Sequence, residues 1–332
     1  IEHATGHLMY ARFIHKVLRD LGYSDVPEPF ARLLTQGMVC LEVMKCSKDG
    51  YLYPEEVSDQ GDGTWACKLC GGPVTVGRSE KMSKSKRNTK DPNDYIERYG
   101  ADTIRVFSLF AAPPNKDLDW SDSGVEGVYR FLKRLWRYVF DHRELLQGVA
   151  VEMPACRSGQ SKTADALRQK THATIRKITQ DFDGRYHFNT SISACMEIVN
   201  QLYGMDVPPP EDPKHAAVTG AIREAIRVLI QMMNPFAPHM MEELWHILGG
   251  TEILALGPWP EWDETIAAEK TIEIPVQVNG KVRVRLTVAA DMPAEELETM
   301  VREDVTVAQW VEGRTIRKII VVPNRLINVV AG

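Results

Sequence analysis

Cysteine is scarce in this chain, with only six among 332 residues. So few cysteines exclude the disulfide-rich scaffolds of small secreted domains and favour a reducing compartment, so we expect a cytoplasmic protein. No apolar run approaches the roughly 18 residues of a membrane helix, and no basic segment followed by an apolar core opens the chain, so we expect neither a membrane span nor a secretion signal. No sign of charge dominates, because 40 basic residues stand against 45 acidic ones. The length favours two or three domains.

Positive charge is nevertheless concentrated in one place. Residues 78–90 read RSEKMSKSKRNTK, in which Glu80 is the only acidic residue. This density of Lys and Arg in a serine-rich stretch suits a polyanion such as a phosphate chain or RNA. On charge alone, a solvated surface loop explains the stretch equally well.

The same stretch contains the strongest chemical motif of the chain, Lys81-Met82-Ser83-Lys84-Ser85. Two lysines three positions apart on a mobile loop can close over a triphosphate. Their ammonium groups would then stabilise the charge that develops as the α-phosphate is attacked and pyrophosphate leaves. We therefore expect all five residues to contact ATP, with Lys81 and Lys84 as the catalytic pair.

The hydrophobic periodicity predicts helices in the middle of the chain and a small α/β unit at its end. The middle helices should form an antiparallel bundle. Near the end, Asn279-Gly280 between two alternating runs predicts a type I′ hairpin. The helices are expected at 122–146, 163–182, 188–204, 214–233 and 235–248, the late strands at 272–279, 281–289 and 316–330 (split at Pro323), and the late helices at 293–302 and 305–312.

Four of the cysteines fall in residues 36–78, which read as a small β-rich insertion. Cys67-Lys-Leu-Cys70-Gly has the form of a zinc knuckle. A second pair is needed to complete a tetrahedral site, and Cys40 and Cys46 are the candidates, although a separation of six residues is unusual for a knuckle. We predict a structural Zn²⁺ on these four cysteines, with a metal-free insertion as the alternative.

Three groups of basic residues are candidates for binding RNA. In the hairpin, Lys281, Arg283 and Arg285 alternate with apolar residues, which places all three cations on one strand face. That face is either a surface that follows a phosphate backbone or an ordinary solvated face. The full candidate set is Arg130, Lys133, Arg134, Arg137, Lys281, Arg283, Arg285, Arg314, Arg317 and Lys318.

Taken together, the motifs resemble those of class I aminoacyl-tRNA synthetases. Beyond the lysine loop, the resemblance rests on Gly100-Ala101-Asp102-Thr103 with Arg105, and on Asn234-Pro-Phe-Ala-Pro-His239 followed by Glu242-Glu-Leu-Trp245. The finer pattern is similar to bacterial-type leucyl enzymes, and it covers essentially the whole chain. The segments that carry it are IEHATGHLMYARF at 1–13, FAAPPNKDLDWSDSGVEGVYRFLKRLW at 110–136, VQVNGKVR at 276–283 and VVPNRLINVV at 321–330.

The resemblance implies an aminoacyl-tRNA ligase that joins leucine to AMP, using ATP with Mg²⁺, and then transfers leucine to the 3′ end of tRNA(Leu). It places Glu2, His3 and His7 at the amino-acid pocket. The i, i+4 spacing of His3 and His7 would also suit a metal pair or a packed core pair. However, Ala4 stands where HExxH proteins carry a glutamate. We expect a monomer.

The resemblance also implies a multidomain α+β fold. Neither the first ATP motif of these synthetases nor their editing domain is found in the sequence, so we expect the C-terminal part of a larger enzyme that is inactive alone. The expected regions are the end of a Rossmann-type catalytic domain at 1–35, the leucyl-specific zinc-ribbon-like insertion at 36–78, the lysine loop and stem-contact region at 79–121, a helical tRNA-binding bundle at 122–265 and an α/β tRNA-binding domain at 271–332.

Two alternatives remain open at this point. A synthetase for valine, isoleucine or methionine would share the fold and the ATP chemistry, although the segment at 1–13 and the hairpin argue against it. A non-catalytic RNA-binding protein built from synthetase parts would explain the lack of the first ATP motif.

Overall fold

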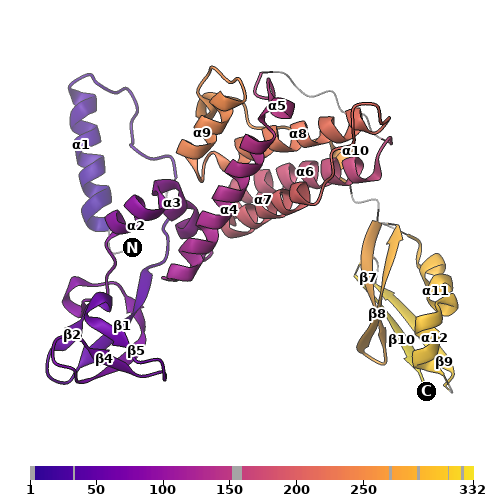
Figure 1. Cartoon of the computed structure of the whole chain (residues 1–332), viewed down its shortest axis with the longest axis horizontal. Helices are drawn as coiled ribbons and strands as arrows, with labels where there is room; N and C mark the ends of the chain where they lie inside the picture. Colours follow the sequence, from indigo (N-terminus) through magenta and orange to yellow (C-terminus); the bar gives the residue numbers. More distant parts are fainter. Residues whose placement is uncertain are drawn as a thin grey trace. The chain divides into compact units, whose positions relative to one another are not determined.

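The computed structural model describes residues 4–32, 34–151, 159–268, 271–289, 292–312, 314–322 and 325–332. By their contacts these residues form two compact units. One comprises the chain up to Leu167 together with Thr174–Glu261, and the other comprises Arg168–Ala173 and Trp262–Gly332. Both helices and sheets are present, as the predicted α+β class requires (Figure 1). Within the described residues, no helix is both long and apolar enough to cross a bilayer.

The first unit begins with the π-helical turn η1 (Ala4–Leu8) and helix α1 (Met9–Asp20). No residue of α1 is buried, and Tyr10 and Phe13 are among its exposed apolar side chains. Glu28 holds the following segment against the helix, because its carboxylate accepts hydrogen bonds from Arg12 at 2.8 Å and from Lys16 at 3.2 Å. These bonds, that from Arg12 first, lower the pKa of Glu28 to about 2.

A β-sheet follows and leads directly into the lysine loop. Its strand order is β2-β1-β5-β4-β3, and β6 pairs in parallel with β1. Gly37 is required where the chain enters this sheet, since a Cβ atom there would lie 2.1 Å from the carbonyl oxygen of Lys116. The strands are β1 (Val39–Cys46), β2 (Gly50–Leu52), β3 (Val57–Asp59), β4 (Trp65–Cys67), β5 (Pro73–Lys81) and β6 (Leu118–Asp119), with the 3₁₀ turns η2 (Pro54–Glu56) and η3 (Lys84–Lys86).

The rest of the first unit is helical, and its core is the largest of the chain. Helix starts follow the expected chemistry: Asp91, Ser121 and Ser161 each cap a helix by accepting a backbone N–H. Helix α8 is buried around most of its circumference, as a central bundle helix must be. The helices are α2 (Pro92–Tyr99), α3 (Ala101–Phe110), α4 (Asp122–Asp141), α5 (Arg143–Leu146), α6 (Lys162–Gln180), α7 (Phe188–Tyr203), α8 (His215–Met233) and α9 (Pro238–Ile247), with the turns η4 (Asp181–Arg185) and η5 (Leu254–Leu256).

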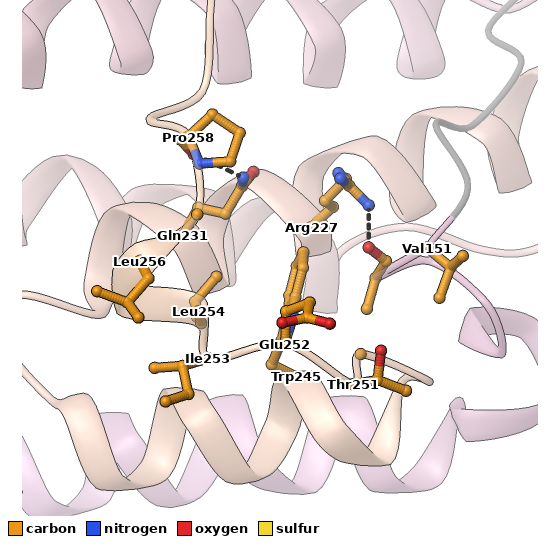
Figure 2. A pocket seen from close by; sticks show the side chains of 13 residues that line it. Val151, Arg227, Gln231, Trp245, Thr251, Glu252, Ile253, Leu254, Leu256 and Pro258 are labelled. Carbon is orange, nitrogen blue, oxygen red and sulfur yellow. Dashed lines mark hydrogen bonds between the residues drawn. The ribbon is translucent and has the colours of Figure 1, made fainter.

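A cavity of about 450 Å³ lies where α8 and α9 meet the segment 250–258 (Figure 2). Arg227 donates to the carbonyl oxygen of Ala150 at 2.7 Å, and its guanidinium stacks over the ring of Trp245. Glu242 holds the segment that contains the lining residue Leu254, because its carboxylate accepts the backbone N–H groups of Leu254 and Ala255 at 2.8 and 2.9 Å. Trp245, from the motif at 242–245, lines this cavity, but none of the residues predicted to bind ATP, leucine, metal or tRNA does.

After α10 (Glu264–Ala267), the second unit is a four-stranded sheet with two helices on one face (Figure 1). The strand order is β8-β7-β10-β9, in which β7 and β10 are parallel and the other pairs antiparallel. The predicted two-residue hairpin is confirmed, since Val278 pairs with Lys281, and Asn279 and Gly280 both have positive φ. The elements are β7 (Thr271–Val278), β8 (Lys281–Ala289), α11 (Ala294–Glu303), α12 (Val305–Val311), β9 (Ile316–Val322) and β10 (Leu326–Ala331).

Candidate functional site

The lysine loop leaves the sheet at the end of β5. Lys81 is the last residue of that strand and pairs with Cys40, and the backbone N–H of Met82 donates to the carbonyl oxygen of Val39 at 2.9 Å. Lys84 then opens the 3₁₀ turn η3, which Arg87 ends in the left-handed conformation with φ of 53°. The side chains of Lys81 and Lys84 are exposed, and the hydroxyls of Ser83 and Ser85 lie 2.7 Å apart. The structure therefore presents both lysines on one short segment, with Lys81 at the end of β5 and Lys84 at the start of η3.

A third lysine of the loop has a partner of its own. Lys86 forms an ion pair with Glu80, which lowers the pKa of Glu80 and raises the pKa of Lys86. Glu80, the single acidic residue among the six basic ones of 78–90, is thus paired with Lys86. This arrangement fixes the base of the loop.

Asn88 is the residue of this region that the sequence analysis missed. Its side chain is buried behind the loop and accepts the backbone N–H of Ser83 at 2.9 Å. A polar residue buried beside a charged motif is not visible in periodicity, so only its position shortly after the lysines could have drawn attention to it.

Three of the predicted cysteines converge on a single point. The thiols of Cys46 and Cys70 lie 3.5 Å apart, and Cys67 donates to a carboxylate oxygen of Asp49 at 3.3 Å. The possible ligand atoms of Cys46, Asp49, Cys67 and Cys70 all lie within 4.8 Å of one another. Three thiols and one carboxylate are a donor set that Zn²⁺ accepts in tetrahedral sites.

Cys40 is not part of this cluster, and the ligand set predicted from the sequence is wrong in this respect. Cys40 and Cys46 both lie on β1, and six residues of extended strand span roughly 20 Å. Cys40 instead donates to the carbonyl oxygen of Met38 at 3.8 Å. Asp49, and not Cys40, brings the fourth possible ligand atom to the cluster.

The cluster is built from two turns of the same form. Cys46-Ser-Lys-Asp49-Gly50 and Cys67-Lys-Leu-Cys70-Gly71 share their spacing, and the glycines have φ of 73° and 71°. Hydrogen bonds from the backbone N–H groups of Asp49 and Lys48 lower the pKa of Cys46, whereas the carboxylate of Asp49 raises the pKa of Cys70 to about 12. The repeated Cys-x-x-(Cys/Asp)-Gly pattern could have identified Asp49 from the sequence.

The basic residues of α4 form an exposed stripe. Arg130, Lys133, Arg134 and Arg137 recur on successive turns and are all exposed. Lys133 lies over the ring of Tyr129, and Arg134 stacks on Tyr203 while donating to Asn200 at 2.9 Å. Beside the stripe is an apolar hollow of about 570 Å³, lined among others by Tyr99, Tyr129, Trp136 and His239.

Alternation predicted that the three cations of the hairpin lie on one strand face. The structure differs, because they do not share one continuous face. A β-bulge interrupts β8, because Val284 pairs with Val276 and Val282 pairs with Gln277, which leaves Arg283 as the extra residue. Arg283 stacks on Trp310 of α12, with its guanidinium carbon 4.0 Å from the ring centre, whereas Arg285 approaches Glu273 at 3.9 Å. Arg314, Arg317 and Lys318 are also exposed, with Arg317 and Lys318 adjacent on β9.

The predicted amino-acid pocket is described only in part. Glu2 and His3 lie outside the described residues, and His7 is exposed within η1. The two motifs at 100–105 and 234–239 do meet, however. Arg105 donates to the carbonyl oxygen of Pro235 at 3.1 Å, and Asp102 contacts His239.

Comparisons with known proteins agree with this arrangement. The family profile described as "Anticodon-binding domain of tRNA ligase" matches residues 165–299, and that described as "tRNA synthetases class I (I, L, M and V)" matches residues 63–121. A leucine–tRNA ligase of Syntrophus aciditrophicus (strain SB) is 50% identical over 99% of this chain and 37% of its own length. A leucine–tRNA ligase of Desulfatibacillum aliphaticivorans is 46% identical over 99% of the chain and 38% of its own length.

A solved structure is similar over the whole chain as well. It is the LeuRS chain of a ternary LeuRS–tRNA–LeuAMS complex from Agrobacterium radiobacter K84, with a TM-score of 0.64 and 31% identity over 100% of this chain and 37% of that one. The chain thus spans a little over a third of the length of the relatives that it matches.

Proposed function

We propose that this chain, which belongs with the class I leucine–tRNA ligases over its whole length, supplies the lysine loop and the RNA-binding parts of such an enzyme. The reaction that we assign to the whole enzyme has two steps. The carboxylate of leucine attacks the α-phosphorus of ATP, which forms leucyl-adenylate and releases pyrophosphate. Leucine is then transferred to a 3′-terminal hydroxyl of tRNA(Leu), and AMP leaves.

The observation that carries the proposal is the exposure of two lysines three positions apart, Lys81 at the end of β5 and Lys84 at the start of η3. Negative charge grows on the phosphate oxygens in the first step, and two ammonium groups held in place stabilise it without reorganisation. ATP enters as its Mg²⁺ complex, so the lysines add to the charge neutralisation that the substrate already carries. Met82, Ser83 and Ser85 complete the proposed ATP contacts, and Glu2, His3 and His7 remain our assignment for the leucine pocket.

We assign tRNA binding to the stripe on α4 and to the basic residues of β8 and β9. The stripe is exposed and lies beside an aromatic hollow, and this combination favours a sugar-phosphate backbone with an occasional stacked base. Backbone contacts position an RNA without reading its sequence. We propose that these surfaces recognise the shape of tRNA(Leu).

The cluster of Cys46, Asp49, Cys67 and Cys70 is our proposed site for a structural Zn²⁺. When bound, the ion would join two turns of an insertion whose apolar core is small. The cluster contains none of the lysines assigned to ATP, so its role is to hold the fold. We also propose that the protein acts in the cytoplasm as a monomer, and that this chain alone forms no adenylate.

The test uses a chimera, in which this chain replaces the matching segment of the Syntrophus aciditrophicus ligase. Leucine-dependent exchange of pyrophosphate into ATP is measured for the chimera and for its Lys84→Ala variant. We expect exchange in the chimera and a loss of about 10²–10³-fold in the variant. Lys162→Ala is the matched control, because Lys162 is an exposed lysine at the start of α6, outside both the loop and the cysteine cluster. Equal rates for Lys84→Ala and the control would overturn the proposal.

A further inference from the structure

Asn88 makes four hydrogen bonds with its side chain while only 1% of the residue is exposed. Its Oδ1 accepts the backbone N–H of Ser83 at 2.9 Å. Its Nδ2 donates to the carbonyl oxygens of Leu41 and Glu80, both at 3.0 Å, and of Lys81 at 3.3 Å. An amide offers two N–H donors, so one of them is shared between two of the three carbonyls, while its oxygen accepts the N–H of Ser83.

Most hydrogen-bond partners of the Asn88 side chain belong to the lysine loop and the strand end before it. Three of the four, at Glu80, Lys81 and Ser83, belong to the strand end and the loop itself, and only the carbonyl of Leu41 belongs to the neighbouring strand β1. The bond to Ser83 closes the segment 83–88, and Lys84 stands inside that closed segment. Asn88 therefore links both lysines to a fixed strand without touching either ammonium group.

Other contacts secure the same segment but do not replace this one. Met82 is tied to Val39 by its backbone, and Lys86 is tied to Glu80 by its side chain. Asn88 instead bonds to the backbone of residues 80, 81 and 83 through one side chain. Without its amide, two carbonyls and one N–H at the loop base lose a buried partner, which disfavours the present arrangement of the loop.

We infer that Asn88 is a positioning residue for leucine activation, and that it acts through the lysine loop. The inference rests on the proposed function. Small displacements of a catalytic group have large effects, since a shift of about 1 Å can reduce a rate about 10²-fold. The backbone of β5 pairs with β1 along most of its length, so removal of the Asn88 amide should loosen the loop and leave the sheet in place.

The test compares Asn88→Asp with Asn88→Ala in the chimera described above. Aspartate keeps the size and the acceptor oxygen but turns a carboxylate toward three carbonyls. We expect leucine-dependent exchange to fall at least about 10-fold in kcat, with unchanged KM for leucine and unchanged tRNA binding. Asn93→Asp is the matched control, because Asn93 is exposed at the start of α2.

A double-mutant cycle with Lys84→Ala separates positioning from general damage. If Asn88 acts through the loop, Asn88→Asp will slow exchange by a smaller factor in the Lys84→Ala background than in the unsubstituted chimera, so the two losses will not add. We also expect trypsin to cut within residues 81–87 faster in both Asn88 variants. Additive losses in the cycle, unchanged trypsin cleavage, or exchange equal to that of Asn93→Asp would overturn the inference. Absence of leucine-dependent exchange in the unsubstituted chimera would instead contradict the proposed function.

Discussion

The carboxylate of Asp102 accepts a hydrogen bond from Nδ1 of His239 at 2.8 Å, although 137 positions separate the two residues. The same carboxylate accepts the backbone N–H of Met240 at 2.7 Å. Asp102 therefore caps the N-terminus of α9 from helix α3, where a negative charge also meets the positive end of the helix dipole. Two motifs that the sequence shows only as separate segments are parts of one junction.

This junction predicts a measurable loss of stability. Asp102→Ala leaves the first N–H groups of α9 without their acceptor, and we expect the free energy of unfolding to fall by about 2 kcal/mol. Urea denaturation of the chain measures it. The matched control is Asp94→Ala, since Asp94 is exposed on α2. An Asp102 variant as stable as this control would contradict the proposed junction.

The metal site predicts a contrast between cysteines. We expect freshly purified, unchelated protein to contain about one zinc per chain, and both Cys67→Ser and Asp49→Ala to lower that content below half. Cys40→Ser should keep the full content, because Cys40 bonds to Met38 away from the cluster. Elemental analysis of the four proteins decides the matter. Zinc loss in Cys40→Ser with retention in Asp49→Ala would restore the ligand set expected from the sequence.

Asp122 predicts a pH dependence at the junction of α2 and α4. Its carboxylate accepts the hydroxyl of Tyr95 at 2.6 Å and the indole N–H of Trp120 at 2.8 Å, and it approaches Lys90 at 3.3 Å. Partial burial raises the pKa of Asp122, but these hydrogen bonds and the charge of Lys90 together lower it below the ordinary value. A lowered pKa in the folded state means that the carboxylate stabilises the fold above the unfolded pKa of about 3.9 and ceases to do so as the pH falls through the folded value.

We therefore expect Asp122→Asn to lose about 1 kcal/mol at pH 7, a small value because the carboxylate is partly in contact with water. The difference from the unsubstituted chain should shrink as the pH is lowered below about 3.9. Urea denaturation at pH 7 and at a pH below about 3.9 measures this difference in the free energy of unfolding. Asp141→Asn, on the exposed end of α4, is the control. A difference that grows on acidification would contradict this assignment.

The basic residues of β8 predict a change in the salt dependence of tRNA binding. Each lost phosphate contact reduces the slope of log affinity against log salt by about one. We expect Arg283→Glu with Arg285→Glu, in the chimera, to weaken tRNA(Leu) binding and to flatten that slope by about two. Glu295→Gln on the exposed face of α11 should leave the slope unchanged. A loss of affinity with an unchanged salt slope would show that the two arginines do not contact phosphates.

Local patterns were sufficient to predict most elements of the fold. Helix α8 could be found because its apolar residues recur through the whole segment, and the β7–β8 hairpin because Asn279-Gly280 tolerates positive φ at both positions. Both signals depend only on neighbouring residues. The α+β class and the order of bundle and α/β unit follow from such signals.

Features that depend on distant residues were not predictable in this way. The bulge at Arg283 is invisible to alternation, because one extra residue changes the face without changing the pattern. Asp49 was missed because only cysteines were counted as ligands, and Asn88 because its partners are backbone groups, which no side-chain pattern reports. Each omission concerns a polar contact, whereas the periodicity reports apolar burial.

The central claim is that this chain serves a ligase for leucine, and amino-acid-dependent ATP–pyrophosphate exchange by the chimera tests it most directly. The panel should contain leucine, isoleucine, valine and methionine at equal concentration. We expect exchange with leucine alone, and its loss in the Lys84→Ala variant. Preferential exchange with isoleucine, valine or methionine would contradict the assignment to leucine, and no exchange by a folded chimera that still binds tRNA would favour a non-catalytic RNA-binding protein.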